Sequence, residues 1–212
     1  MARNDVRCSM QHTSLFPGKN DVRATWMRNI SSCKDIITIS HGCLDVANTL
    51  RHRGRILICD IDSKVVESAN YIREGDPRNN KPSDYPRLNL LPIVMNRDIL
   101  TTILDYLVQY DVKNLGAIDI DLACTIEEAW RIAKPIFRML PMWKYHGKVL
   151  LTYRNGRDAH GKNASEKRVR TLIRRLPKGV RYESHEKYRS DWIGRNATRE
   201  IGSSMCIVTF AF

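Results

Sequence analysis

Two carboxylates that follow a short apolar run are the residues of this chain best suited to binding chemistry. The run Ile56–Cys59 is typical of a buried strand, and Asp60 and Asp62 follow it, just before a segment with helical spacing. A carboxylate at the tip of a parallel strand can accept hydrogen bonds from the two vicinal hydroxyls of a ribose. The segment therefore predicts an adenosine-containing cofactor. The alternative is that either acid only caps the helix that follows.

Three further acids stand at or near the ends of apolar runs. Asp98 follows the run Leu90–Met95 and stands where it would cap the next helix. Asp119 and Asp121 alternate along one apolar run, so they face the same side of the predicted strand. An unpaired buried carboxylate is costly, so two acids in one buried strand need a reason. Asp121 is nearer the carboxyl end and is predicted at the reaction centre; the alternative is an Asp paired with an Arg of a neighbouring helix.

Strand and helix patterns alternate from about residue 35 onward. The predicted strands span residues 36–39, 56–59, 90–95, 117–123, 148–153, 180–184 and 205–212, with a late start to the third because of Pro92. Helices are predicted at residues 44–53 (closed by Gly54), 65–72, 100–108, 125–140 and 169–176. The buried helix faces are predicted to include Leu104, Val108 and Ile132. Repeated β-α units predict an α/β fold: a doubly wound, seven-stranded sheet, mostly parallel with an antiparallel last strand.

Composition sets the broad class of the protein. The 212 residues predict a single domain, residues 35–212, preceded by an N-terminal basic extension, residues 1–34. The net charge of +12 favours a polyanionic partner, and the alternative is a merely basic surface. Six cysteines without a CxxC pair predict reduced thiols and no metal site. No apolar run approaches the roughly 20 residues of a membrane span, so the expected location is cytoplasmic.

The order of these elements and motifs resembles the class I S-adenosylmethionine-dependent methyltransferases, over about residues 35–212. That family has a Rossmann-like sheet whose seventh strand is inserted antiparallel beside the sixth. The matching motifs are Asp60 after the second strand, Val94–Ile99 around Asp98, Ala117–Leu122, and Gly147 before the fifth strand. The resemblance implies S-adenosyl-L-methionine as cofactor, with Asp98 near the adenine. The cofactor contacts that it implies are Ser40, His41, Gly42, Asp60, Asp62, Asp98 and Asp119.

The first loop departs from the family pattern of an acid followed by a run of glycines. Here it reads Ile39-Ser-His-Gly-Cys43, with one glycine and no acid. We expect His41 to be structural rather than catalytic. This departure motivates an alternative, a non-catalytic methyltransferase-like module that binds nucleic acid or a partner protein.

Two basic segments follow the predicted fifth and sixth strands, at the edge where such a sheet binds its ligands. Their predicted substrate-binding residues are Arg154, Arg157, Lys162, Lys187, Arg189, Trp192 and Arg195. Arg and Lys suit phosphates, and aromatic faces suit stacked bases. The helix between them carries a basic face that either extends this footprint or is simply solvated. The sequence therefore predicts a methyltransferase acting on nucleic acid, RNA ahead of DNA, with Asp121 catalytic; an enzyme acting on small molecules or proteins is a third alternative.

Overall fold

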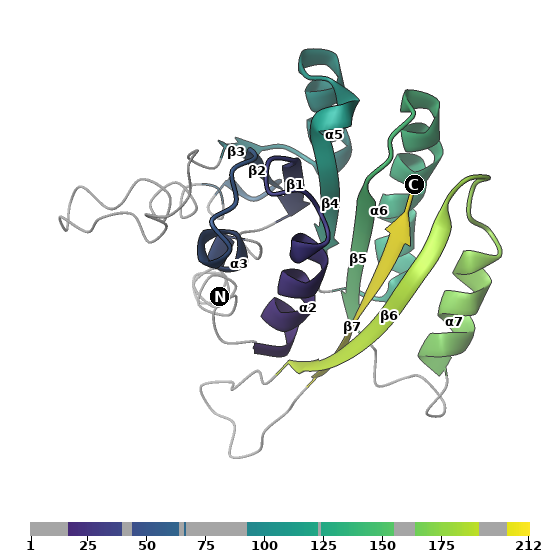
Figure 1. The fold of residues 1–212 in the computed structure, drawn as a ribbon. Helices are drawn as coiled ribbons and strands as arrows, with labels where there is room; N and C mark the ends of the chain where they lie inside the picture. The colour runs from purple at the N-terminus through teal and green to yellow at the C-terminus, as the bar shows by residue number, and fades with distance from the viewer. Residues whose placement is uncertain are drawn as a thin grey trace. The chain divides into compact units, whose positions relative to one another are not determined.

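A computed structural model describes residues 17–39, 44–63, 66, 93–122, 124–154, 164–190 and 203–212. The strands form one seven-stranded mixed sheet in the order β3-β2-β1-β4-β5-β7-β6 (Figure 1). β1, β2 and β3 pair in parallel, and β7 pairs antiparallel with both β5 and β6. The predicted fold class is therefore confirmed. The chain divides into two compact units, residues 1–118 and 119–212.

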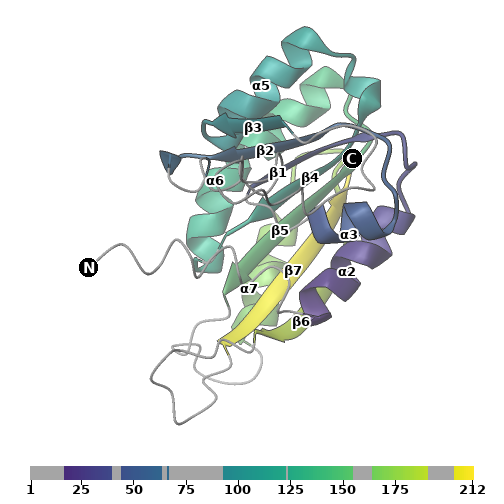
Figure 2. The ribbon, with the colours of Figure 1, turned by 90° about the vertical axis from the view of Figure 1, so that its left-hand side faces the viewer.

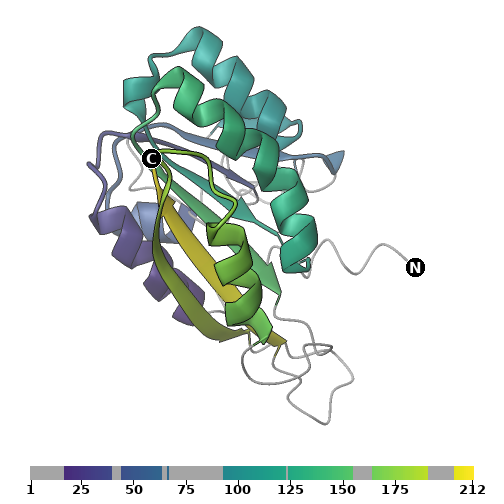
Figure 3. The ribbon, with the colours of Figure 1, turned by 90° about the vertical axis from the view of Figure 1, so that its right-hand side faces the viewer.

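The first unit holds the parallel strands. Its described elements are α2 (Pro17–Arg28), β1 (Asp35–Ile39), α3 (Leu44–Thr49), β2 (Ile56–Asp60), β3 (Ile93–Asn96), α5 (Ile99–Gln109), η1 (Val112–Asn114) and the first part of β4 (Leu115–Asp121). The strands β1 and β2 are buried along almost their whole length, as expected where helices cover both faces of a parallel sheet. Accordingly, α2 and α3 lie on one face of these strands and α5 on the other (Figures 2 and 3).

The helix α3 ends earlier than predicted, at Thr49 rather than at residue 53. Arg51 takes a left-handed conformation with φ 52°, and the His52 N–H donates to the Ala47 carbonyl at 2.9 Å. This is the bond pattern of a Schellman C-cap, in which the left-handed residue usually is glycine. The sequence prediction failed because an arginine fills the position that glycine normally marks.

Gly54 has another role, the close approach of two backbone segments. A Cβ atom at this position would lie 2.0 Å from the Lys34 carbonyl oxygen, a distance that no side chain tolerates. The same carbonyl lies 2.8 Å from Nε2 of His52. Gly54 therefore lets the turn before β2 pack directly against the turn before β1.

The buried face of α5 differs from the predicted one. Ile103 and Leu107 are buried as predicted, but Leu104 and Val108, also expected inside, have exposed fractions of 41% and 80%. Tyr106 is buried in their place. The Tyr106 hydroxyl donates to the Asp35 carboxylate at 2.7 Å. This bond holds the side of α5 that carries Tyr106 against the core. The prediction from the apolar pattern failed because such a pattern does not show which tyrosine has a buried partner.

The N-terminal segment contributes to the core of the first unit through α2. Arg23, Trp26 and Met27 of this helix are buried, and α2 packs beside α3 (Figure 2). The predicted separation of residues 1–34 as a basic extension stays a prediction.

The second unit holds the antiparallel strands. Besides the end of β4, its described elements are α6 (Ile126–Met139), η2 (Leu140–Trp143), β5 (Lys148–Arg154), α7 (Ala164–Ile173), β6 (Arg181–Ser190) and β7 (Ser203–Ala211). Figure 3 shows α6 and α7 on the same face of these strands. Phe137 of α6 packs edge-on against Phe210 and Phe212, with ring centroids 4.9 and 5.3 Å apart.

The capping box at the start of α6 is confirmed. The Thr125 hydroxyl accepts from the Glu128 N–H, and the Glu128 carboxylate accepts from the Thr125 N–H. Pro135 lies inside the helix. Ile132, predicted on the buried face, is instead exposed, because the helix turns Ala129, Ala133 and Ile136 to the core.

The strand β6 is twice as long as the predicted 180–184 segment. It continues to Ser190, so Lys187 and Arg189 lie in a strand rather than in a loop. The extension pairs with β7, down to Ser190 opposite Ser203. A polar sequence can extend a strand when a neighbouring strand supplies the hydrogen bonds, which the sequence of one segment does not show. The strand β4, at Leu115–Asp121, begins and ends two residues before the predicted 117–123 segment. Among the described residues, no helix is long and apolar enough to cross a membrane.

Candidate functional site

The carboxyl ends of β1, β2 and β3 lie level at one edge of the first unit. The register pairs Ile39 with Cys59 and Asp60 with Asn96. Asp60 is half-buried at this edge, and its Oδ1 accepts the Asp62 N–H at 2.9 Å. Burial raises the pKa of Asp60, and the hydrogen bond from the Asp62 backbone opposes that rise. Asp60 is therefore a carboxylate held partly out of water.

This carboxylate fits the ribose site that the sequence predicts. Within the part of the chain that the structure describes, its donors are backbone N–H groups of the following turn, and no Lys or Arg pairs with it. An acceptor that is desolvated without a countercharge can gain hydrogen bonds from a ligand's hydroxyls. Asp62 is exposed, and its carbonyl accepts the Val66 N–H at 3.1 Å, as the capping alternative for this residue requires.

Asp98 caps α5 with its whole carboxylate. Oδ1 accepts the Thr101 N–H at 3.0 Å, and Oδ2 accepts the Thr101 hydroxyl at 2.6 Å. The bond from the Thr101 hydroxyl is the largest cause of a lowered Asp98 pKa. The capping alternative for Asp98 is thus confirmed, while its contact with a cofactor stays a prediction.

Two acids of β4 differ in their access to solvent. Asp119 has an exposed fraction of 1%, whereas Asp121 is half-buried as the last residue of the strand. Each has an interaction partner within the chain. Asp121 is therefore the one of the pair that a substrate could reach, and Asp119 is packed inside the second unit.

The predicted substrate residues that the structure describes gather at one end of the second unit. The register places Arg154 of β5 opposite Met205 of β7. On its other side, Met205 lies opposite Tyr188 of β6, whose neighbours along the strand are Lys187 and Arg189. Because β5 and β6 both run antiparallel to β7, this is the carboxyl end of both strands. Ser40, His41, Gly42, Arg157, Lys162, Trp192 and Arg195 lie outside the described residues.

A cluster at the opposite, amino edge of the first unit was not predicted from the sequence. Asp35 is 3% exposed and accepts hydrogen bonds from the Arg55 N–H (2.8 Å), the Arg55 Nε (2.9 Å) and the Tyr106 hydroxyl. The Arg55 guanidinium also stacks on Tyr110, 3.7 Å from the ring centroid. Burial raises the pKa of Tyr106. The available signal was an acid and an arginine that directly precede the apolar runs 36–39 and 56–59, since parallel pairing of these runs brings the two residues together.

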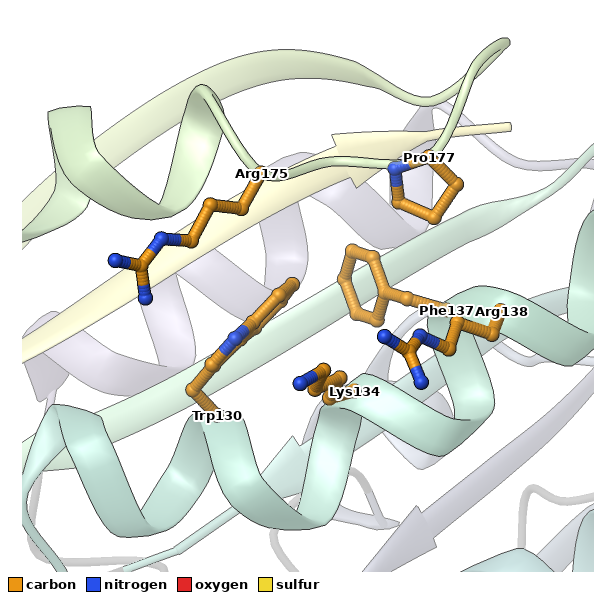
Figure 4. Close-up of a pocket in the computed structure, with 6 residues that line it drawn as sticks. All are labelled: Trp130, Lys134, Phe137, Arg138, Arg175 and Pro177. Atoms are coloured by element: carbon orange, nitrogen blue, oxygen red, sulfur yellow. The ribbon is translucent and has the colours of Figure 1, made fainter.

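A pocket of about 420 Å³ in the second unit was also missed. Figure 4 shows four lining residues on α6, with two more after α7. The lining consists of Trp130, Lys134, Phe137, Arg138, Arg175 and Pro177. The available signal was a series of cations at helical spacing on α6. No three His, Cys, Asp or Glu side chains of the described segments gather as a metal site would require.

Solved structures with the same fold place this architecture among known proteins. A candidate tRNA (m1A22) methyltransferase from Streptococcus pneumoniae is 13% identical with a TM-score of 0.52, covering 92% of this chain and 69% of that one. The branched-chain polyamine synthase of Thermus thermophilus, in complex with N4-aminopropylspermidine and 5'-methylthioadenosine, is 9% identical with a TM-score of 0.53, covering 92% and 56%. Magnesium protoporphyrin IX methyltransferase from Synechocystis PCC 6803, with bound S-adenosylmethionine, is 12% identical with a TM-score of 0.50, covering 93% and 79%.

No protein-family profile and no curated protein matches the sequence. The chain has the fold of the class I S-adenosylmethionine-dependent methyltransferases, as the sequence predicted. At these identities the likeness concerns the fold, and a fold does not by itself determine a function.

Proposed function

We propose that this chain is an S-adenosylmethionine-dependent methyltransferase that acts on a nucleic acid, RNA ahead of DNA. The observation that carries the cofactor is Asp60, a half-buried carboxylate at the end of β2, without a cation partner among the described residues. In a doubly wound sheet this is the position that binds the ribose of a nucleoside cofactor. The half-buried Asp121 is the proposed catalytic residue.

The chemistry divides between the cofactor and the chain. Bound S-adenosylmethionine supplies an activated methyl group, so the protein must mainly orient the nucleophile and exclude water. The Asp60 carboxylate would accept hydrogen bonds from the ribose hydroxyls. Asp121 would accept a proton from the attacking group where that group is a hydroxyl, which is too weak an acid to lose its proton unaided.

The charge of the chain supports a nucleic-acid substrate. A net charge of +12 favours polyanions, and three of its cations, Arg154, Lys187 and Arg189, stand at one end of the second unit. One of the similar structures is named for a tRNA, but others are named for a polyamine and a porphyrin. The substrate therefore has to be tested directly. The buried, free thiol of Cys59 fits the reducing cytoplasm that we propose as its location.

Calorimetry with S-adenosylmethionine and S-adenosylhomocysteine tests the cofactor. We expect Asp60→Asn to weaken both by about tenfold or more, because hydrogen bonds to a charged acceptor are lost. Glu127→Gln is the matched control, since Glu127 is exposed on α6 in a surface ion pair with Arg168 at 3.2 Å. A folded wild type that binds neither ligand would overturn the proposal.

Transfer of a labelled methyl group to RNA, DNA, protein and small-molecule pools in parallel tests the substrate. We expect label in the RNA pool, and Asp121→Asn to abolish it while leaving the affinity for S-adenosylhomocysteine unchanged. Label only in protein or small molecules would remove the nucleic-acid part of the proposal. Polynucleotide binding without affinity for either adenosine ligand would instead support the non-catalytic module.

A further inference from the structure

The pocket on α6 combines an aromatic ring with three cations. In Figure 4 the Trp130 ring projects from α6 into the space between Arg175 and Phe137. Phe137 packs edge-on against it, with 5.2 Å between the ring centroids. Trp130 is half-buried, so part of its ring remains available to a ligand. The pocket therefore offers an aromatic platform on which a planar ring can stack.

The cations around this platform lack acidic partners. Lys134, Arg138 and Arg175 are exposed, and none of them pairs with a carboxylate in the described part of the chain. The described residues that line the pocket include no acid. Three unpaired cations around one aromatic ring repel each other unless an anion joins them, so the pocket is suited to a ligand with a planar ring and negative charge.

The surface beside the pocket favours a polymer over a single small anion. The connection from α7 to β6 and its neighbourhood carry further exposed cations: Arg170, Arg174, Lys178 and Arg181. Arg175 and Pro177 precede the start of β6, whereas Lys187 and Arg189 lie near its end. A strand of this length spans about 30 Å, so the basic residues form two groups, one at each end of β6, and a polymer can reach both whereas a single small anion cannot.

We infer that this pocket holds one nucleotide of a single-stranded polynucleotide, with its base stacked on Trp130 and the neighbouring phosphates bound by Lys134, Arg138 and Arg175. Stacking is tolerant of sequence, and cations bind the phosphates that every strand carries. The inference rests on the nucleic-acid part of the proposed function. It adds a second nucleic-acid-binding position on the α6 face of the second unit. This position is at the opposite end of β6 from the predicted substrate residues.

Fluorescence anisotropy of a labelled 16-nucleotide single-stranded RNA, titrated with the full chain at several salt concentrations, tests the inference. We expect Lys134→Gln, Arg138→Gln and Arg175→Gln each to weaken binding and to reduce the slope of log affinity against log salt by about 0.7. Arg53→Gln is the matched control, because Arg53 is an exposed arginine of the first unit outside the pocket. Pocket variants that behave like Arg53→Gln would overturn the inference.

Two ring variants test the stacking. We expect Trp130→Leu to weaken RNA binding by about tenfold with an unchanged salt slope, and Trp130→Phe to recover most of the loss. The exposed-cation variants keep the test valid if Trp130→Leu unfolds. A 16-base-pair duplex bound as tightly as the single strand would refute the stacked base.

The outcome separates this inference from the proposed enzyme activity. The RNA titrations use no cofactor, and we expect every pocket variant to bind S-adenosylhomocysteine with wild-type affinity. Loss of RNA binding in the pocket variants of a chain that binds no S-adenosylhomocysteine would sustain the pocket and refute the methyltransferase. Normal methyl transfer to RNA with no effect of the pocket variants would refute the pocket alone.

Discussion

The two edges of the parallel strands in the first unit place their acids in opposite circumstances. At the amino edge Asp35 is buried and holds three donors from Arg55 and Tyr106. At the carboxyl edge Asp60 is half-buried and, among the described residues, receives only backbone N–H groups. The first arrangement is complete without a ligand and serves stability. The second gains from a ligand that brings donors, which is what a binding site requires.

The largest expected effect on stability is at the amino edge, where Asp35 lies. Asp35→Ala should destabilise the protein by about 3 kcal/mol, because it leaves the Arg55 guanidinium and the buried Tyr106 hydroxyl without their acceptor. Urea denaturation followed by tryptophan fluorescence measures the change. A loss as small as that of an exposed surface charge would show that the amino edge is not a stabilising cluster.

Removal of one hydroxyl from the same cluster should cost less. Tyr106→Phe is expected to lower the free energy of unfolding by about 2 kcal/mol, since the bond to the charged Asp35 is lost while the ring remains. Tyr110→Phe is the control: its ring stacks on Arg55, and no described residue bonds its hydroxyl. Equal effects of the two variants would contradict the role given to the Tyr106 bond.

Loss of the N-cap of α5 should have an effect on stability of intermediate size. Asp98→Ala should destabilise by about 1 kcal/mol through loss of the N-cap of α5, and Asp98→Asn should recover most of it. The pKa of Asp98 is lowered in the fold, so its contribution is present above the unfolded pKa and is lost as the pH falls through the folded pKa. The difference in stability between wild type and Asp98→Ala should therefore shrink at strongly acidic pH; a constant difference would argue against a contribution from the charge of the cap.

The smallest expected effect has the opposite sign. The pKa of Asp60 is raised in the fold, so the fold favours its protonated form, and that advantage is lost as the pH rises through the folded pKa. Asp60→Asn should therefore leave stability unchanged or slightly increased at pH 7, with a gain that appears only as the pH rises from acid. Thermal melting across pH 3 to 8 measures it. Clear destabilisation at pH 7 would mean that Asp60 is structural, like Asp35.

Much of the sheet could be predicted from local patterns. Short β-branched and apolar runs identified all seven strands, and Pro92 correctly delayed β3, which begins at Ile93. The capping box at Thr125 marked the start of α6 to the residue. These signals are local, so the sequence alone carries them. The late end of β6 was missed because its polar half is a strand only by virtue of its pairing with β7.

The residues of the candidate site also differ in how far the sequence alone could predict them. The position of Asp60 at the end of β2 could be predicted because an acid directly after an apolar run is a pattern along the chain; its role in binding a cofactor stays a proposal. Asp98 left two interpretations open, and only the coordinates showed Thr101 occupying both of its oxygens. The Asp35 cluster and the pocket around Trp130 join residues from separate elements, so a signal within one segment, such as the cations of α6, could not indicate the complete site.

The sequence by itself determined the alternation of strands and helices, the basic charge and the acids at strand ends, because periodicity and residue type act over a few neighbouring positions. Only the tertiary structure decided which acid is satisfied, which face of α5 is buried and which cations share a pocket. Those outcomes depend on how buried polar groups find partners across elements far apart in the chain, where the cost of an unpaired group selects one arrangement.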